Sequence, residues 1–381
     1  MATELRAEIV EAVREAVVDR VAPRAADIDR EGVFPEDIRT LFASLGLLGL
    51  TTPEEYGGFG QPLGVAVDVI MEIARVCANS ANIVTQQSLG ASPIVIGGSH
   101  EQKLRWLPRL ASGDHLASFA LTEPGAGSDN RSMATTARRE GDHYLLSGTK
   151  VFCTWGSIAN VLTVFAQARS DPDGDGIVAL VVEPPAEGLV VNRLEEKMGL
   201  HGSPTAQLTF DGLRVSVENR LGKPGDGLRT ALRSLNPGRV EIGALGLGIA
   251  VGALQVASHY LEERSQFGQK LSSFQGLQFK IADHATSIEA AYRLLLAAAE
   301  AVDAGSSDQV RLSAMAKLLA TDTAMAVTVD AVGLLGGYGY LKDYPVERMM
   351  RDAKVMQIVE GTNEIQRVIA AREWFRRLPP G

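Results

Sequence analysis

The sequence predicts an α+β protein of several domains, in which a small β domain separates two helical regions. Its 381 residues are enough for two or three domains of ordinary size. Helical periodicity fills both ends of the chain, and short β-rich runs fill the middle. We therefore expect an N-terminal all-α domain at 1–117, a small β-barrel or β-sandwich domain at 118–225, and an antiparallel four-helix bundle at 226–381.

The N-terminal region begins with an amphipathic helical pattern. Its apolar residues recur at helical spacing with charged residues between them, and they are Ile9, Val13, Ala16, Val17 and Val21. Three later stretches have the same periodicity: Asp37–Leu50, Val65–Ala78 and Glu101–Ala111. We expect this region to be mostly helical.

The middle region consists of short β-rich runs separated by turn-forming residues. Five runs are predicted strands, namely Tyr144–Leu146, Val161–Ala168, Ile177–Val182, Leu189–Val191 and Gln207–Phe210. The turn signals between them are Ser147-Gly148, Asp171–Gly176, Pro184-Pro185 and Asp211-Gly212. This alternation predicts a small all-β domain.

The C-terminal region returns to helical periodicity. Four helices are predicted, at Val240–Arg264, Phe274–Ala304, Val310–Leu335 and Val355–Arg376, the last interrupted by Gly361. Short connections between successive helices are typical of an antiparallel bundle.

Composition and charge exclude several classes of protein. The net charge of −9 argues against nucleic acid as the main partner. No run of about 20 uncharged apolar residues is present, so we expect no membrane span. The only cysteines, Cys77 and Cys153, form no CxxC motif, which favours a reducing compartment. The N-terminus lacks a signal-peptide pattern, and we expect a cytoplasmic protein.

Several tempting motifs fail when their spacing is checked. Asp171-x-Asp173-x-Asp175-Gly176 resembles the start of a calcium loop, but Val182 occupies the position that needs a glutamate, so a solvated turn is predicted. No histidines have metal-ligand spacing, and we expect no metal site. Gly246-x-Gly248 has no preceding strand, and these glycines more plausibly allow two helices to approach closely.

Two segments are distinctive: FALTEPGAGSD at 119–129, and YPVERMMRDAK at 344–354 followed by QIVEGTNEIQR at 357–367. Six others occur in a consistent order: Leu104–Gly113, GTKVFCT at 148–154, KMGLHGSPT at 197–205, Asn219–Gly222, ERSQFG at 263–268 and LGGYG at 335–339. Together they closely resemble the signatures of the acyl-CoA dehydrogenase family across essentially the whole chain. Eight segments in register are far more specific than a lone motif.

The resemblance implies that the protein binds FAD. The small residues of segment 119–129 would let backbone N–H groups reach a flavin, although alone they would read as a surface turn. The implied flavin contacts are Phe119, Leu121, Thr122, Ser128, Phe152 and Thr154, with Thr362 and Glu364 from the last motif. Arg264 matches a position that binds the FAD phosphates; its alternative is a solvated arginine at a helix end.

The resemblance further assigns the adenosine end of FAD to Phe267, Gln275 and the loop Gly333–Gly337, including Gly336, partly from a neighbouring subunit. Shared FAD binding implies an oligomer, and the family pattern suggests a homotetramer. Gly333 replaces a frequent glutamine of the family, so only a backbone contact is implied there.

Glu360 is the predicted catalytic residue. Ile358 and Val359 precede it, and such an apolar setting should raise its pKa toward the working pH, as a general base requires. In the family mechanism this glutamate removes the α-proton of the acyl thioester while the β-hydrogen leaves as hydride to flavin N5. The products are the trans-2-enoyl thioester and reduced FAD, whose electrons pass to electron-transfer flavoprotein.

The resemblance also implies a substrate site. Ser128, Asn236 and Arg239 match positions beside the CoA moiety, and Gly361 lets the backbone approach the substrate. The alternative for Arg239 is a solvated side chain in the first turn of a helix. By the same resemblance, Thr85, Gln86 and Leu89 line the acyl tunnel.

Several residues depart from the family pattern. Val359 stands where many straight-chain members have tyrosine, and a smaller side chain there could admit a branched or bulkier acyl group. Phe152 replaces a frequent tryptophan, and His201 a common arginine. Other interpretations of the function stay open. The protein could act on a substrate bound to acyl-carrier protein, or be an enoyl reductase, an oxygen-using oxidase or hydroxylase, or a flavin-binding paralogue without turnover.

Overall fold

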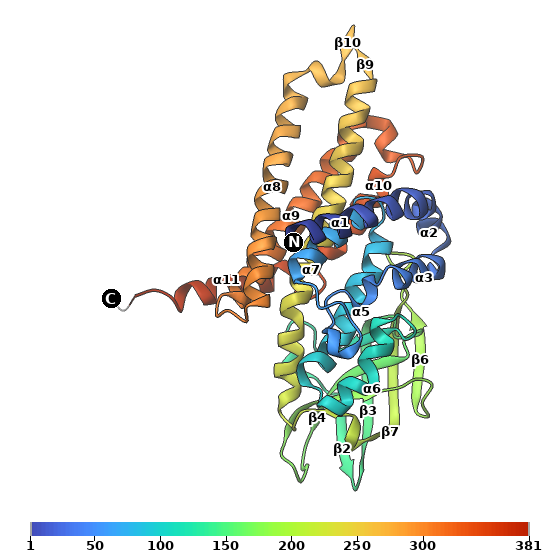
Figure 1. The fold of residues 1–381 in the computed structure, drawn as a ribbon, viewed down its shortest axis with the longest axis vertical. Helices are drawn as coiled ribbons and strands as arrows, with labels where there is room; N and C mark the ends of the chain where they lie inside the picture. The colour runs from blue at the N-terminus through green and yellow to red at the C-terminus, as the bar shows by residue number, and fades with distance from the viewer. Residues whose placement is uncertain (1, 380–381) are drawn as a thin grey trace.

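The computed structural model describes residues 2–379, in which a β-sheet lies at one end of the molecule and the N- and C-terminal helices pack against each other (Figure 1). The N-terminal helices are α1 (Ala2–Ala16), α2 (Ala25–Glu31), α3 (Glu36–Ser44), α4 (Leu63–Ala74), α5 (Ala78–Gly97) and α6 (His100–Ala111). The periodic stretches correspond to α1, α3, α4 and α6, with the predicted C-terminal ends of α3 and α4 several residues too long. Helices α2 and α5 were not predicted. Helix α5 is buried along most of its length, so it lacks the polar face that gives a helical period.

The sheet contains the strands β1 (Ala117–Ala120), β2 (Thr136–Glu140), β3 (His143–Thr154), β4 (Val161–Ala168), β5 (Gly176–Val182), β6 (Leu189–Leu194), β7 (Thr205–Ser216) and β8 (Arg220–Leu221). Their order is β6-β7-β3-β2-β4-β5-β8, and β1 pairs with β4 in parallel. A separate hairpin joins β9 (Ser265–Gln266) to β10 (Gln269–Lys270). All five predicted strands are confirmed. The turns predicted at Ser147-Gly148 and Asp211-Gly212 are wrong, because these residues lie inside β3 and β7, which are therefore longer than predicted. A shift of register in β3 between Leu146 and Gly148 accommodates the first pair within the strand.

The C-terminal helices are α7 (Asp226–Glu263), α8 (Gln275–Asp303), α9 (Gln309–Leu334), α10 (Val346–Met356) and α11 (Asn363–Phe375). The predictions for α8 and α9 are correct to within one residue. Helix α7 begins 14 residues before the predicted start, at Asp226 rather than Val240, and it contains Pro237. The interruption predicted at Gly361 is confirmed as a loop at 357–362, but it separates two helices, and α10 rather than Val355–Arg376 supplies the fourth helix that packs on α7 and α9.

Glycines on α7 set how closely it packs. A side-chain carbon at Gly248 would lie 2.5 Å from the carbonyl oxygen of Met71, and one at Gly252 would lie 2.0 Å from that of Arg75. Both contacts are with α4 and the turn after it. The prediction that these glycines permit close helix packing is therefore confirmed for Gly248 and Gly252, while Gly246 makes only ordinary contacts.

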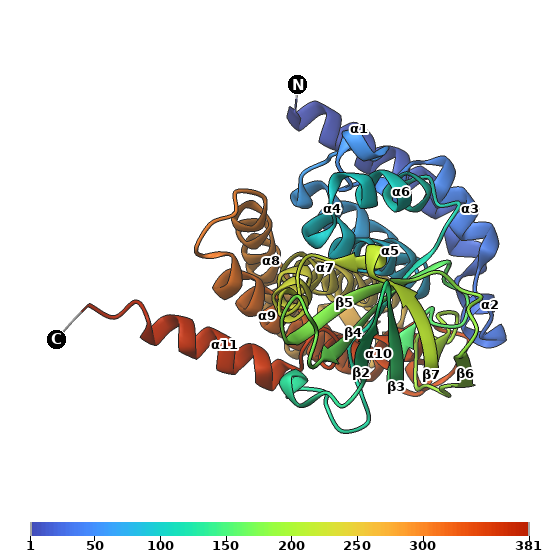
Figure 2. The same ribbon diagram turned by 90° about the horizontal axis from the view of Figure 1, so that it is seen from below.

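The long helices define the shape of the molecule. Helix α7 runs from the sheet at one end to the β9–β10 hairpin at the other (Figure 1). Helices α7 and α9 are long and apolar enough to cross a membrane, but most of each lies inside the fold, as in core helices. Helix α11 extends away from the body (Figure 2). Val368, Trp374 and Phe375 on it are at least half exposed.

Candidate active site

The loop between α10 and α11 carries Glu360 in an unusual backbone conformation. Glu360 has φ of 54° and Gly361 has φ of 93°, both in the left-handed region. A residue with a side chain seldom adopts this conformation, and such strain persists where the surrounding contacts hold it. The loop therefore presents the Glu360 side chain in a direction that neither flanking helix could provide.

The Glu360 carboxylate is enclosed although the residue as a whole is only half-buried. Its Oε2 atom is buried and has no hydrogen-bond partner among the described residues. Burial raises the pKa of Glu360 to about 7, although the positive charges of Arg239 and Lys317 lower it. Gly238 on α7 makes room for the carboxylate, because a side-chain carbon there would lie 2.1 Å from Oε2.

Two buried cations, Arg239 and Lys317, donate hydrogen bonds to backbone carbonyl oxygens of this loop. Arg239 donates from Nε to the Glu360 carbonyl oxygen at 3.4 Å and from Nη1 to Asn236 Oδ1 at 3.2 Å. The solvated alternative for Arg239 is therefore wrong, because the side chain is 4% exposed and lies well inside α7. Lys317 on α9 donates to the Gly361 carbonyl oxygen at 3.1 Å and to Asn363 Oδ1 at 2.8 Å.

Lys317 was missed by the sequence reasoning. It is fully buried, and burial lowers its pKa to about 8. The signal was available in the run Ser313–Ala320, where a single lysine interrupts an otherwise apolar and small-residue stretch of helix. A lysine in such a position must find a partner, because burial of an unpaired ammonium group is costly.

The segment 119–129 lies against the end of β3. Thr122 accepts a backbone hydrogen bond from Val151 at 2.9 Å, and Ser118 donates from Oγ to the Thr154 carbonyl oxygen at 2.6 Å. The structure thus brings together two segments that were predicted separately. Phe119 packs on Phe165 of β4, with ring centroids 4.9 Å apart.

A buried ion pair beneath this segment also escaped the sequence reasoning. Lys150 donates from Nζ to Glu123 Oε1 at 2.8 Å and to the Leu121 carbonyl oxygen at 2.9 Å. Glu123 also accepts from the backbone N–H of Thr135 at 3.0 Å. Because every partner is satisfied, the pair fixes the start of segment 119–129 rigidly on the sheet.

Phe152 is presented outward by a bulge in β3. Pairing with β7 shifts register between Lys150 and Cys153, and Phe152 between them has φ of 57°. A bulge commonly re-aims a side chain in this way. The ring is 65% exposed, beside a turn where side-chain carbons at Gly125 and Gly127 would meet nothing within 4 Å. An exposed aromatic ring beside an open backbone turn suits a planar ligand.

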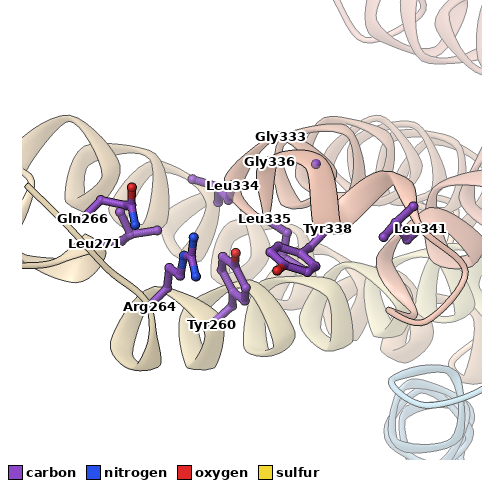
Figure 3. A pocket seen from close by; sticks show the side chains of 11 residues that line it. Tyr260, Arg264, Gln266, Leu271, Gly333, Leu334, Leu335, Gly336, Tyr338 and Leu341 are labelled. Atoms are coloured by element: carbon purple, nitrogen blue, oxygen red, sulfur yellow. The ribbon is translucent and has the colours of Figure 1, made fainter.

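A hollow lies at the C-terminal end of α7 (Figure 3). It has a volume of about 500 Å³ and is lined by Arg264, Tyr260 and Tyr338 with the loop Gly333–Gly337. The Arg264 guanidinium lies 5.9 Å from the centre of the Tyr338 ring. Side-chain carbons at Gly333, Gly336 and Gly337 would meet nothing within 4 Å. The structure thus groups Arg264 with three of the glycines predicted beside it.

Comparisons with known proteins identify the family. Three domain models match: "Acyl-CoA dehydrogenase, N-terminal domain" at 3–114, "Acyl-CoA dehydrogenase, middle domain" at 118–213 and "Acyl-CoA dehydrogenase, C-terminal domain" at 225–375. The chain is 44% identical to an acyl-CoA dehydrogenase of Bacillus subtilis, over 94% of this chain and 95% of that protein. This chain belongs to the acyl-CoA dehydrogenase family.

Two further relatives of the family are informative. A cyclohex-1-ene-1-carbonyl-CoA dehydrogenase of Geobacter metallireducens is 43% identical, over 97% of this chain and 98% of that protein. The crystal structure of a Bacillus anthracis acyl-CoA dehydrogenase complexed with FAD superposes with a TM-score of 0.92 at 31% identity, covering 98% of this chain and 67% of that one. This acyl-CoA dehydrogenase is accordingly an FAD-dependent oxidoreductase that acts on CH–CH bonds.

The residues present fit FAD in two separate places. The outward Phe152 ring and the open turn at 125–127 suit the flavin, and Arg264 with its glycine loop suits a phosphate-bearing end. Yet Arg239 and Arg264 lie at positions of α7 that are about 37 Å apart at 1.5 Å per residue. The Glu360 loop, which Arg239 contacts and which includes the predicted flavin contact Thr362, is therefore far from the Arg264 hollow within one chain.

The remaining predicted site residues are placed as follows. Thr362 caps α11, because its side chain accepts from the Ile365 backbone N–H, and Glu364 lies exposed in the first turn of that helix. Ser128 is exposed in the open turn, and Gln275 begins α8. Phe267 is 93% exposed at the tip of the β9–β10 hairpin. Nothing in this chain alone covers Phe267 among the described residues.

The acidic stretch at 171–175 is part of a structural network. Asp171 is buried and accepts a hydrogen bond from the Tyr144 hydroxyl at 2.5 Å. Arg220 donates to that hydroxyl at 2.7 Å and to Asp173 Oδ2 at 3.1 Å. The prediction of a solvated turn is therefore wrong for Asp171, because arginine side chains pair with Asp171 and Asp173 and connect the turn to β3 and β8.

Proposed function

We propose that this enzyme dehydrogenates an acyl-CoA thioester between its α and β carbons, with Glu360 as the base. The observation that carries the proposal is the enclosed Glu360 carboxylate, whose Oε2 has no partner and whose pKa is raised to about 7. A base with this pKa is half-deprotonated at neutral pH, which suits removal of a weakly acidic α-proton.

The chain's own residues have distinct tasks in the proposed reaction. Glu360 accepts the α-proton at Oε2, and the enclosed site excludes water from that proton. Arg239 and Lys317 hold the backbone of the loop, so that the Glu360 N–H is available to stabilise the negative charge that develops on the thioester oxygen. Bound FAD supplies the acceptor for the β-hydride.

The roles of the other predicted residues stay part of this proposal. We assign the flavin end of the cofactor to Phe119, Leu121, Thr122, Phe152 and Thr154. We assign the CoA end of the substrate to Ser128, Asn236, Arg239 and Gly361. We also propose that electron-transfer flavoprotein accepts the electrons, that the enzyme is cytoplasmic, and that the domains divide at 117/118 and 225/226.

An oligomer, with FAD shared between subunits, is part of the proposal. Two observations support it: the distance of about 37 Å between the Arg239 and Arg264 regions of α7, and the exposed apolar residues of α11. A flavin held at one end of the chain needs a phosphate site close by, and a second chain can provide it. We propose a homotetramer, as the family resemblance implies, and sedimentation velocity would measure it.

Anaerobic titration of the purified holoenzyme with a panel of acyl-CoA thioesters tests the function. We expect the flavin absorbance near 450 nm, a property of FAD itself, to bleach with at least one thioester and to stay unchanged in Glu360→Gln. Failure of the whole panel to bleach the wild-type enzyme would overturn the proposal. Product mass and oxygen consumption in air separate the dehydrogenase from an oxidase, a hydroxylase and an enoyl reductase.

The panel should include branched and cyclic acyl groups and an acyl-carrier-protein thioester. Val359 precedes the base where many relatives have tyrosine, and it is half-buried against the core. We propose that this smaller side chain admits a branched or bulkier acyl group. The cyclohex-1-ene-1-carbonyl-CoA relative is consistent with this. Equal kcat/KM for wild type and Val359→Tyr across the panel would contradict it.

A further inference from the structure

A second buried carboxyl group lies on the Glu360 side of α7. Glu241 is 1% exposed, and its Oε1 accepts a hydrogen bond from Ser88 Oγ of α5 at 2.7 Å. Its other oxygen, Oε2, is buried and has no partner among the described residues. Buried polar atoms are almost always hydrogen-bonded, so an orphan oxygen of this kind requires an explanation.

Glu241 faces a cavity between α5 and α7. The cavity has a volume of about 280 Å³, and Ser88 and Glu241 line it. Its wall combines apolar residues of α5, among them Val84, Ala91 and Val95, with polar and charged residues of other elements, among them Arg233 and Asp303. A cavity with both apolar walls and polar groups can hold the acyl part of a small molecule.

The cavity is adjacent to the proposed base. Pro237 lines it, and the next residue, Gly238, faces the Glu360 carboxylate. Glu241 follows Gly238 by three residues, so both lie on the same side of α7, about 4.5 Å apart along the helix axis. A substrate that places its α-carbon at Glu360 and extends between α5 and α7 reaches Glu241 within one helical turn.

The protonation of Glu241 decides what it can bind. Burial raises its pKa to about 8, and the negative charge of Glu360 raises it further, against the hydrogen bond from Ser88. At neutral pH the group is therefore mostly a neutral carboxylic acid. Because Oε1 accepts from Ser88, the proton is on Oε2, which makes that atom a donor without an acceptor.

We propose that Glu241 donates a hydrogen bond to an uncharged oxygen on the acyl group, so that the preferred substrate carries a hydroxyl or keto group beyond its β-carbon. This inference rests on the proposed dehydrogenation at Glu360 and adds the class of acyl group to it. Ser88 is a positioning residue, because it fixes which oxygen of Glu241 carries the proton. The oxygen-bearing substrate satisfies a buried donor that a plain hydrocarbon chain leaves unpaired.

The test compares kcat/KM for acyl-CoA thioesters of one length, either unsubstituted or with one hydroxyl or keto group at successive carbons beyond the β-position. We expect wild type to prefer one substituted thioester by about tenfold or more. Glu241→Leu should abolish the preference, whereas Glu241→Gln, which keeps a neutral donor of the same shape, should retain most of it. Because the readout is a ratio within each variant, a general loss of activity cancels.

The outcomes separate this inference from the proposed function. An unchanged ratio in Glu241→Leu, or no preference in wild type, overturns the role of Glu241 while flavin bleaching by the unsubstituted thioester still supports the dehydrogenase. Loss of the preference in Glu241→Gln shows that a charged carboxylate is needed and also overturns it. If Glu241→Leu does not fold, Ser88→Ala decides, with a smaller expected fall in the ratio; an unchanged ratio there overturns the proposal. Failure of every thioester to bleach wild type overturns both.

Discussion

Two regions of α7 carry the two groups of predicted functional residues, one near its middle and one at its C-terminal end, and they are built very differently. Near Gly238 and Arg239 the side chains are buried and paired, and one loop is fixed by cations from two helices. Near Arg264 the hollow is open, and the arginine side chain makes a cation–π contact with Tyr338 but no hydrogen bond or ion pair among the described residues. Phe267 on the neighbouring hairpin is almost fully exposed. The first region is enclosed by contacts within one chain, and the second is open.

This difference indicates what each of the two regions of α7 can do within a single chain. A general base needs a fixed position and an environment that sets its pKa, and a single chain supplies both through burial of Glu360. Binding of a phosphate group needs mainly a charged donor and open backbone, and such a site gains specificity when a second surface closes over it. The comparison can be tested by substituting residues of the buried region around Arg239 and of the open region around Arg264 separately.

The largest effect is expected in the buried region around Glu360 and Arg239. Glu360→Gln removes the base without changing the shape of the side chain, and we expect kcat to fall by about 10²–10⁴-fold, the usual contribution of a general base. FAD content should match wild type, because the cofactor residues are untouched. Stopped-flow reduction of the flavin measures the loss, with Glu15→Gln on the exposed face of α1 as control. Loss below threefold would contradict the assignment of Glu360.

In the open region around Arg264 we expect weaker FAD binding with little change in turnover. Arg264→Leu removes a charged donor to the phosphates, and FAD affinity should fall by about 10–100-fold, as for loss of a charge-assisted hydrogen bond. Turnover at saturating FAD should stay near that of wild type. Equilibrium dialysis against FAD gives the affinity, and Arg30→Leu, at a side chain that is 69% exposed, is the matched control. Equal FAD affinity in the two variants would show that Arg264 does not bind the cofactor.

The pH dependence of kcat/KM reports the environment of Glu360 in the buried region. The folded pKa of Glu360 is about 7 and the base must be deprotonated, so kcat/KM should rise with pH and reach half its plateau near pH 7. One pH unit lower, it should be about tenfold below the plateau. Initial rates between pH 5 and 9 measure this profile. A plateau that extends unchanged to pH 5 would be inconsistent with a raised pKa.

A smaller effect is expected for Lys317→Met. The lysine charge lowers the pKa of Glu360, so its removal should move the rising limb of the pH profile to higher pH. The Gly361 carbonyl oxygen also loses a donor, and kcat at the plateau should fall about fivefold, as for loss of one buried hydrogen bond. A purely structural role for Lys317 would lower stability without moving the pH profile.

Particular elements show how far the sequence could predict this molecule. Strand β4 was predicted with its correct ends, because Val161–Ala168 is buried on both faces and reads as one apolar run. Helix α5 is equally buried but mixes small, polar and apolar residues, so no period marks it. The break was predicted at Gly361 alone, and its start at residue 357 was missed because Ile358 and Val359 continue an apolar pattern into the loop.

The site shows the same division. Glu360 was proposed from a local motif, whereas Lys317 and Glu241 were not, because the partners of each lie far away in sequence. Lys317 on α9 donates to Gly361 and Asn363, and Glu241 on α7 accepts from Ser88 on α5. Burial of a charged residue is a property of the folded chain, and a single sequence indicates it only where such a residue interrupts an apolar stretch.

The length of α7 has a consequence for how the enzyme acquires its cofactor. If the flavin and phosphate contacts for one FAD come from different chains, then cofactor retention follows mass action in protein as well as in FAD. Dilution that separates the subunits would release FAD even at constant free cofactor, and FAD would in turn stabilise the assembly. In such an assembly, the spacing along one helix would couple cofactor loading to the cellular abundance of the protein.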